Sequence, residues 1–295
     1  MRRLLPLTLL LACAAPSLER VQTATSTART PGEAGPLDVG RLQVRAAVRV
    51  TESALVEVHA PIADDDQLGA GPFPPVLFVH GGLVPPARYR WWAEHVASRG
   101  YVVITATHPG DLAIFAQGTS AEALWRVREL ADDPDHALYG ALDPDAPAAI
   151  AGHSLGGVVA SRTFIEAPAD FATVGIIASF PAPWDDLASR AGDPVLSIVG
   201  ENDGSADLTR VEDAILAQPE PRLYAVVDGL NHYDWADGVT EDELDKDGPR
   251  GRPVEEARRD AMRVVDTWLD AWLLEDQDAQ DAWFDADFPG VQETR

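Results

Sequence analysis

Short apolar runs recur along the chain and alternate with longer stretches whose apolar positions have helical spacing. A strand that is covered by helices on both faces of a parallel sheet is apolar throughout, so these runs predict buried strands. The first two runs are joined by turn residues and predict an antiparallel pair at the edge of the sheet. The predicted strands are residues 41–50, 54–60, 75–80, 101–106, 148–152, 174–179, 195–199 and 223–227.

The stretches between and after these runs predict helices. The last of them carries Val264, Trp268 and Trp272 at helical spacing. The predicted helices are residues 89–99, 121–131, 155–166, 208–218 and 254–273. We therefore expect an α/β fold with a mostly parallel eight-stranded sheet flanked by helices, in one domain over residues 38–295. The connection into the strand at 195 is too short to hold a large cap domain.

Size and charge narrow the class of partner. The chain has 295 residues, of which 46% are hydrophobic, enough for one large core. Its formal net charge is −25, which opposes binding to nucleic acid or to an anionic membrane surface. We interpret the acidic runs as a solvated surface, and we expect a cationic or neutral substrate to approach more easily than an anionic one.

The N-terminus predicts export. Arg2 and Arg3 precede an apolar stretch over residues 4–11 that is too short to span a bilayer. The single cysteine, Cys13, ends a sequence that resembles the lipobox of bacterial lipoproteins, with lipidation at that cysteine. The alternative is ordinary signal cleavage after Ala14 or Ala15. We expect a lipoprotein anchored at the cell envelope through this lipid alone, or otherwise a periplasmic or secreted protein.

Residues 14–37 follow this signal and contain almost no large apolar side chains. They are rich in Ala, Thr, Ser, Pro and Gly, which is typical of disordered linkers. We therefore expect a flexible tether between the signal at residues 1–13 and the folded domain.

Residues 152–156, with the sequence GHSLG, fit the pattern of a nucleophile elbow. They follow a predicted strand and precede a predicted helix, which is the setting that the turn requires. Glycines at both ends allow a turn tight enough to present Ser154 at the helix N-terminus. There the backbone amides and the positive end of the helix dipole are able to stabilise an oxyanion.

A serine nucleophile needs a histidine and a carboxylate, which follow it in the order acid, then histidine, in this arrangement. His232 is the only histidine beyond Ser154 in the chain. Asp203 follows a predicted buried strand and is therefore expected at the carboxyl edge of the sheet. Glu201 is the nearest rival for the acid.

The oxyanion donors are expected from two loops. One is the amide of Leu155, directly after the nucleophile, and the second comes from Gly82 or Leu83 after the strand at 75–80. His80 and His153 precede or adjoin the serine, and we expect them to hold their loops through hydrogen bonds rather than to act in catalysis.

Four motifs occur in order along the chain: HGG at 80–82, GHSLGG at 152–157, GEND at 200–203 and GLNH at 229–232. With them the chain resembles α/β hydrolases of the dienelactone hydrolase and chlorophyllase-like branch. Residues 91–103 are also similar to bacterial cutinase-like polyester hydrolases and platelet-activating-factor acetylhydrolases. The resemblance covers about residues 41–275 and implies the α/β-hydrolase fold and the cleavage of carboxylic esters.

The same resemblance implies that Trp184 flanks the acyl site, although it is also suited to packing. The polyester hydrolases have a disulfide near the C-terminus, which a chain with one cysteine cannot form. The acidic segment at 236–253 is longer than a connection needs and either covers part of the site or is a solvated loop.

We predict a monomeric serine hydrolase that cleaves small or polymeric carboxylic esters through Ser154, Asp203 and His232, without a metal or organic cofactor. The alternatives are a cell-surface lipoprotein that binds without turnover, and an acyltransferase. An amide or lactone substrate also stays open.

Overall fold

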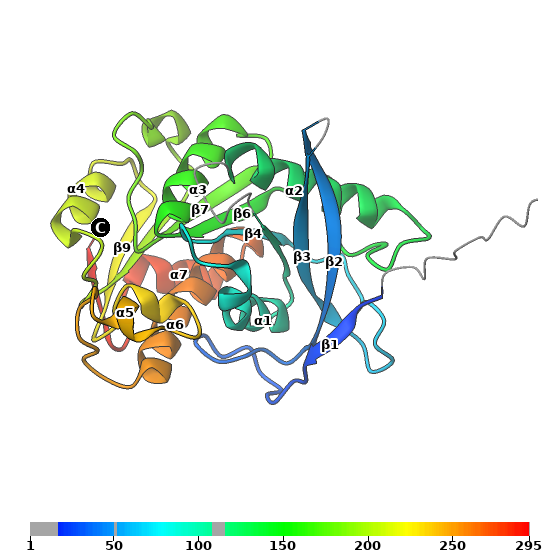
Figure 1. The fold of residues 1–295 in the computed structure, drawn as a ribbon, viewed down its shortest axis with the longest axis horizontal. Helices are drawn as coiled ribbons and strands as arrows, with labels where there is room; N and C mark the ends of the chain where they lie inside the picture. The colour runs from blue at the N-terminus through cyan, green and yellow to red at the C-terminus, as the bar shows by residue number, and fades with distance from the viewer. Residues whose placement is uncertain (1–16, 50–51, 108–115, 295) are drawn as a thin grey trace, which may run out of the picture.

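The computed structural model describes residues 17–49, 52–107 and 116–294. Its strands form one sheet in the order β1-β2-β3-β5-β4-β6-β7-β8-β9-β10 (Figure 1). Their bounds are β1 Glu19–Gln22, β2 Asp38–Arg49, β3 Glu52–Ile62, β4 Pro75–Val79, β5 Val102–Ala106, β6 Ala148–His153, β7 Phe171–Ile177, β8 Val195–Gly200, β9 Arg222–Val227 and β10 Val291–Thr294.

The strands β5, β4, β6, β7, β8 and β9 pair in parallel and form the centre of the sheet. The long hairpin β2–β3 is antiparallel, as its sequence predicted, and joins the centre through β3 and β5. Strands β4, β6 and β8 are buried over their whole length, which explains their apolar runs.

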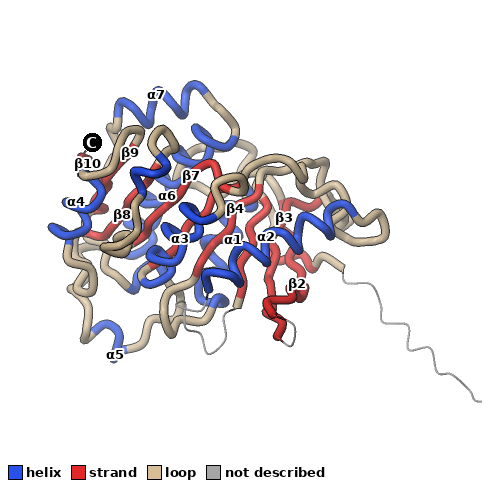
Figure 2. The backbone as a smooth tube through the Cα atoms, turned by 90° about the horizontal axis from the view of Figure 1, so that it is seen from above, coloured by secondary structure: helices blue, strands red, loops and turns tan. Residues whose placement is uncertain are grey.

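Helices cover both faces of this sheet (Figure 1), and Figure 2 shows the strands side by side between them. The core on one face packs α2 and α3 against the strands, and the core on the other packs α1 and α6. The α-helices are α1 Arg90–Ser98, α2 Ala116–Asp132, α3 Leu155–Glu166, α4 Leu208–Leu216, α5 Glu241–Leu244, α6 Val254–Leu273 and α7 Gln277–Asp285. The predicted fold class is therefore confirmed.

Two strands of the described sheet were not among the eight predicted. The strand β1 pairs antiparallel with β2, and β10 pairs antiparallel with β9. Both are short edge strands, and they extend the predicted sheet at its two ends. Between β7 and β8 the only regular element is the short 3₁₀-helix η4, Leu187–Arg190, so this connection carries no large cap.

The structure differs from the expected tether in residues 17–37. Besides β1, this segment contains Leu18, which is buried. Gly35 donates its N–H to the Ser98 hydroxyl at 2.7 Å, and a Cβ atom there would lie 2.2 Å from the Ser98 carbonyl oxygen. The expected disorder is therefore wrong for this part, because the partners that hold it come from distant α1 and α6. Residues 14–16, like Cys13 and the predicted signal, lie outside the described residues.

No helix within the described ranges has the length and apolarity needed to cross a membrane.

Candidate active site

Ser154 lies between β6 and α3 in a backbone conformation that few side chains adopt. Its φ is 54° and its ψ is −126°, and its side chain does not cap α3. Such a conformation is strained for a residue with a Cβ atom, and strain of this kind concentrates at functional sites. Ser154 is only partly buried. The Ser154 hydroxyl thus lies at the start of α3 without forming a capping hydrogen bond.

The glycines around Ser154 make this turn possible. A Cβ atom on Gly152 would lie 2.2 Å from the Gly156 carbonyl oxygen, and one on Gly156 would lie 2.3 Å from the Val79 carbonyl oxygen. A Cβ atom on Gly157 would lie 2.6 Å from the Cβ of Ser179. Side chains at these positions would push α3 away from the sheet, so the GHSLGG motif is a packing requirement as well as a turn signal.

Asp203 and His232 form a pair at the carboxyl edge of the sheet. The Nδ1 atom of His232 lies 2.9 and 3.1 Å from the two carboxylate oxygens of Asp203, whose side chain is fully buried. Nδ1 therefore carries the proton that the carboxylate accepts, which leaves Nε2 free to accept a proton from a nucleophile.

The carboxylate of Asp203 is also held by its own loop. Its Oδ1 atom accepts the N–H groups of Ser205 and Ala206 at 2.9 and 2.6 Å. The rival acid, Glu201, is exposed and accepts the N–H of Gly229 instead. Of the two acids that the sequence left open, Asp203 is the one in contact with His232.

A chain of buried hydrogen bonds joins the elbow to the loops on either side. Tyr89 accepts the N–H of Gly81 at 3.1 Å, and its hydroxyl lies 2.9 Å from Nδ1 of His153. The Nε2 atom of His153 lies 3.0 Å from the backbone carbonyl oxygen of His232. The rings of His153 and His232 are also in contact, with centroids 4.7 Å apart.

The protonation states of Tyr89 and His153 decide which atom donates and which accepts in each of these hydrogen bonds. Burial holds the pKa of His153 well below its usual range, and the neighbouring His232 lowers it further. Burial also raises the pKa of the Tyr89 hydroxyl. Both groups are therefore neutral near pH 7. The His153 Nε2–H donates to the carbonyl of His232, and its Nδ1 accepts the Tyr89 proton. His153 holds the site together, as the sequence predicted.

The two segments predicted to supply oxyanion donors lie next to each other. Leu155 is the first residue of α3, and its N–H is among the helix donors without an intrahelical acceptor. A Cβ atom on Gly82 would lie 3.1 Å from Cδ2 of Leu155. The next residue, Leu83, has a φ of 63° and an exposed side chain. The loop after β4 therefore lies against the start of the elbow helix.

A mostly apolar pocket opens beside the elbow, with a volume of about 490 Å³. This volume is in the range of small-molecule sites. Trp184 belongs to its wall and is 75% exposed, so the indole is available to a ligand. The lining residues are Leu155, Val158, Val159, Arg162, Phe180, Ala182, Pro183, Trp184 and Arg210.

Two arginines from different helices line this pocket. Arg162 stacks on Trp184, at 5.6 Å from the ring centroid, and forms an ion pair with Asp185. Arg210 stacks on Phe180 at 4.0 Å. Among the described residues, no carboxylate lies within 4.0 Å of the Arg210 guanidinium. The pocket thus combines apolar walls with a cation that has no such partner.

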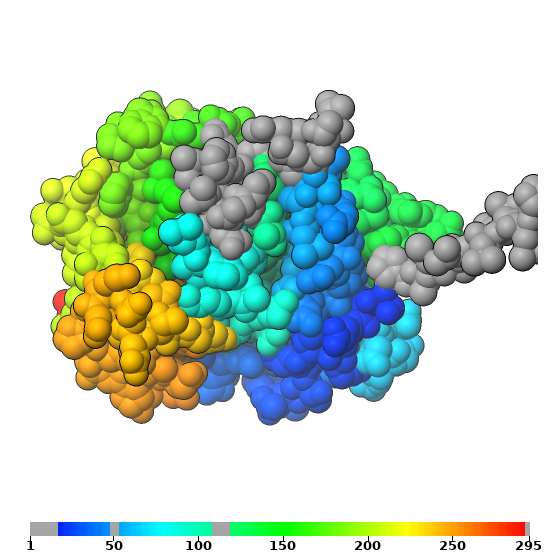
Figure 3. All heavy atoms as spheres, in the orientation of Figure 1, coloured from blue at the N-terminus to red at the C-terminus, as the bar shows by residue number. Residues whose placement is uncertain are grey.

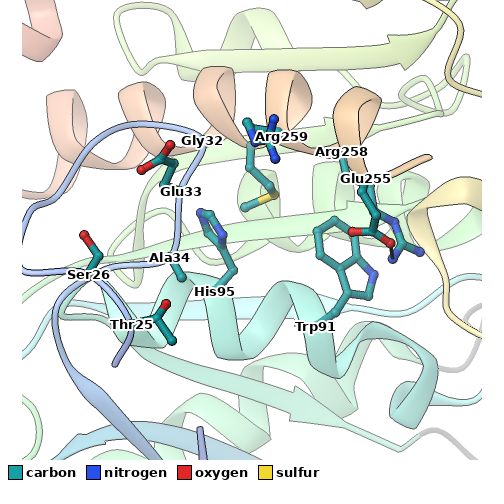
Figure 4. Close-up of a pocket in the computed structure, with 11 residues that line it drawn as sticks. Thr25, Ser26, Gly32, Glu33, Ala34, Trp91, His95, Glu255, Arg258 and Arg259 are labelled. Atoms are coloured by element: carbon teal, nitrogen blue, oxygen red, sulfur yellow. Dashed lines mark ion pairs between the residues drawn. The ribbon is translucent and has the colours of Figure 1, made fainter. Parts of the chain in front are cut away.

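A second cavity, of about 460 Å³, lies under the N-terminal segment (Figure 4). Its lining includes Glu33 of that segment, His95 of α1 and Arg259 of α6. None of its lining residues belongs to the loops of Ser154, Asp203 or His232. We therefore place the candidate active site at the apolar pocket beside the elbow.

The acidic segment at 236–253 lies beside the segment that contains Arg88 (Figure 3, yellow to orange beside cyan). Arg88 forms a two-point ion pair with Glu243, at 2.7 and 3.0 Å. Through its hydrogen bond to Arg88, the pKa of Glu243 is lowered to about 2. This segment is therefore bound to the domain rather than solvated throughout. In the described part of the chain, no three metal-ligating side chains gather.

The fold and this arrangement agree with comparisons to known proteins. The sequence model of the alpha/beta hydrolase family matches residues 75–239, more than half of the chain, and the protein belongs to that family. It is similar to the phospholipase YtpA of Bacillus subtilis (strain 168), with 31% identity over 162 residues. This similarity covers 50% of the present chain and 60% of YtpA. The family and this relative support a hydrolase of the ester type.

Sequence reasoning named Ser154, Asp203 and His232, but it missed the residues that join their loops. Tyr89 carried no signal beyond its place in a helical stretch. Arg210 and Asp247 occur among many other charged residues of the acidic chain. Their contacts arise only when segments far apart in sequence are brought together.

Proposed function

We propose that the protein is a serine esterase that cleaves carboxylic esters through an acyl-enzyme. The observation that carries this proposal is the Asp203–His232 pair, held against the elbow by His153 while Ser154 occupies a strained turn. In the chain order that is typical of this family, Ser154 is the nucleophile, Asp203 is the orienting carboxylate and His232 is the general base.

In the proposed reaction the Ser154 oxygen attacks the ester carbonyl carbon, and its proton passes to Nε2 of His232. Asp203 stabilises the imidazolium that forms. The amides of Leu155 and of Gly82 or Leu83 stabilise the oxyanion. The bond to the alcohol then breaks, and the alcohol leaves with the proton from His232. Water repeats the sequence on the acyl-enzyme and releases the acid.

The pocket beside the elbow supports esters with an apolar part. Its walls are mostly apolar, and Trp184 in the wall is exposed. An open site of this kind suits bulky, lipid or polymeric esters.

We propose membership of the dienelactone hydrolase, chlorophyllase-like and cutinase-like branch on the motifs alone. The name of the relative YtpA adds a second candidate substrate, a lipid ester with a phosphate group. Arg210 favours this substrate, because its guanidinium has no carboxylate partner among the described residues and is able to bind a phosphate.

The test is hydrolysis of p-nitrophenyl esters from acetate to palmitate, beside the Ser154→Ala variant. Because residues 17–37 pack on the domain, the protein tested must begin at or before residue 17. We expect turnover that falls by several orders of magnitude in the variant while its thermal unfolding is unchanged. Equal turnover by both proteins contradicts the proposal. Addition of a competing alcohol separates hydrolysis from acyl transfer.

Absence of turnover, together with failure of Ser154 to react with a fluorophosphonate, favours a binding protein without catalysis. For location, we propose export and a lipid anchor at Cys13. A Cys13→Ala variant that leaves the membrane fraction supports this proposal, and one that stays there contradicts it.

A further inference from the structure

One carboxylate, that of Asp247, contacts the loops of both Asp203 and His232. Its Oδ1 atom accepts the N–H of Gly204 at 2.7 Å, and its Oδ2 atom accepts the N–H of Tyr233 at 2.9 Å. Gly204 directly follows Asp203, and Tyr233 directly follows His232. A side chain that belongs to neither loop therefore bridges them, beside the direct backbone hydrogen bond from the Asn202 N–H to the Leu230 carbonyl oxygen at 2.9 Å.

The two N–H groups depend on Asp247. Among the described residues, neither has another acceptor. Oδ1 also accepts the N–H of Gly248 at 2.8 Å, which fixes the carboxylate relative to its own backbone. Hydrogen bonds to a charged acceptor are about twice as strong as those between neutral groups. Loss of the carboxylate therefore removes a hydrogen bond from each of the two loops at once.

The backbone around Asp247 is packed against the same two loops. A Cβ atom on Gly248 would lie 1.9 Å from the carbonyl oxygen of Asn202, directly before Asp203. On the other side, the side chain of Asn231, directly before His232, donates to the carbonyl of Gly248 at 3.1 Å. The segment thus contacts residues before and after each member of the pair.

Nothing in the Ser–His–Asp mechanism requires a second carboxylate at this place. We propose that Asp247 is a positioning residue, which keeps Nδ1 of His232 in register with the carboxylate of Asp203. This inference rests on the proposed function. It predicts an effect on the chemical step rather than on substrate binding, because none of the residues that donate hydrogen bonds to Asp247 lines the apolar pocket.

The experiment compares Asp247→Ala and Asp247→Asn with the wild-type protein and with Asp245→Ala. Asp245 is an exposed acid two positions away and serves as the matched control. We expect kcat to fall about a hundredfold in Asp247→Ala with KM nearly unchanged, since a misplacement of about 1 Å costs a rate of that order. Asn keeps one oxygen acceptor, so we expect a smaller fall, about tenfold. Asp245→Ala keeps the wild-type kcat.

Labelling of Ser154 with a fluorophosphonate separates positioning from folding. The final extent of labelling counts folded sites, and the rate constant reports how well His232 activates the serine. We expect full extent and a slower rate in both Asp247 variants. If Asp247→Ala is labelled only in part, some of that variant is not folded, and the labelling rate of Asp247→Asn is compared with the wild-type rate instead. Slow labelling in a fully labelled Asn variant supports the proposal, and a wild-type rate overturns it.

A double variant tests the route of the effect. If Asp247 acts through His232, then Asp247→Ala added to His232→Ala lowers the residual rate no further. A further hundredfold fall overturns the proposal, because it requires another route. An inactive wild-type protein contradicts the proposed function itself. An active wild type with unaffected Asp247 variants contradicts only this inference.

Discussion

The Nε2 atom of His153 lies 3.0 Å from the backbone carbonyl oxygen of His232, and the Nδ1 atom on its other side lies 2.9 Å from the Tyr89 hydroxyl. One buried ring therefore connects the elbow, the loop of His232 and the helical turn that contains Tyr89. Because Tyr89 also accepts the N–H of Gly81, a displacement of any one of these loops is felt by the others.

The first prediction concerns the hydroxyl of Tyr89. In Tyr89→Phe the N–H of Gly81 and Nδ1 of His153 both lose their partner. An unsatisfied buried group costs about 1–3 kcal/mol, so we expect a loss of unfolding free energy of that order. We also expect kcat to fall, because the loop after β4, which is predicted to supply an oxyanion donor, is no longer joined to the elbow. Urea unfolding and ester turnover measure the two effects.

The matched control for this change is Tyr139→Phe. Tyr139 is 57% exposed. Its hydroxyl forms no hydrogen bond with the residues described around the site. Its unfolding free energy and turnover stay at the wild-type values. Equal behaviour of the two variants means that the chain from Gly81 to His232 has no role in the site.

The second prediction concerns selectivity at the pocket. If Arg210 binds an anionic group, then Arg210→Gln lowers kcat/KM for lipid esters with a phosphate more than for neutral esters with the same acyl chain. A hydrogen bond to a charged group contributes about 1.5–3 kcal/mol, which is about tenfold to a hundredfold in the ratio. Arg126→Gln, at a surface arginine of α2 paired with Glu129, is the control. An unchanged ratio in Arg210→Gln removes the phosphate ester as a substrate class.

How far the sequence determines the fold is clearest in two helices. The predicted bounds of α3 and α6 are those observed, residues 155–166 and 254–273. For α3 the elbow motif sets the start, and for α6 the apolar spacing covers the whole length. Both signals are local, so a single sequence is enough to find them.

The N-terminal segment shows the opposite case. Three of the four residues of β1 are polar, and only Val21 packs against the core, so the strand depends on its pairing with the edge of β2. The amino-acid composition of the segment predicted a tether, because composition carries no information on partners elsewhere in the chain. The groups that fix the segment are Ser98, Arg99 and Asp266, far away in sequence. The same reason hid Tyr89 and Asp247, whose partners lie on other loops.

The third prediction concerns stability at acid pH. His59 is buried, and burial lowers its pKa to about 4, against the opposing charge of Glu57. An unfolded chain binds this proton below about pH 6.5, whereas the folded protein binds it only near pH 4. Unfolding free energy is therefore lost as the pH falls through this window, by about 1.4 kcal/mol per pH unit for one group. The buried His153 contributes with the same sign.

His59→Leu removes one of these protons. Between pH 7 and pH 5 we expect its unfolding free energy to fall about 2 kcal/mol less than that of the wild-type protein. Urea unfolding at the two pH values measures the difference, and all other titrating groups are common to both proteins. Parallel losses in the two proteins would show that His59 takes up its proton at the same pH in the folded and unfolded chains.

The last prediction concerns the buried arginine that holds the N-terminal segment. The Arg99 side chain is fully buried and forms ion pairs with Asp266 at 3.3 Å and Asp270 at 2.8 Å. It also donates to the carbonyl oxygens of Thr30 and Arg29, at 3.0 and 3.3 Å. In Arg99→Met two carboxylates lose a buried cation and the segment loses its main donor. We expect a loss of about 3–5 kcal/mol in unfolding free energy, together with trypsin cleavage after Arg29.

The cleavage distinguishes this local effect from a general loss of stability. Release of the segment removes only the edge strand β1 and leaves the strands from β2 to β10 paired, so we expect the fragment that begins at residue 30 to stay folded. Arg126→Met changes an arginine in an exposed ion pair, and we expect it to remain uncut at Arg29 with nearly wild-type stability. Cleavage after Arg29 in the wild-type protein at the same rate as in Arg99→Met would mean that the segment is a tether after all.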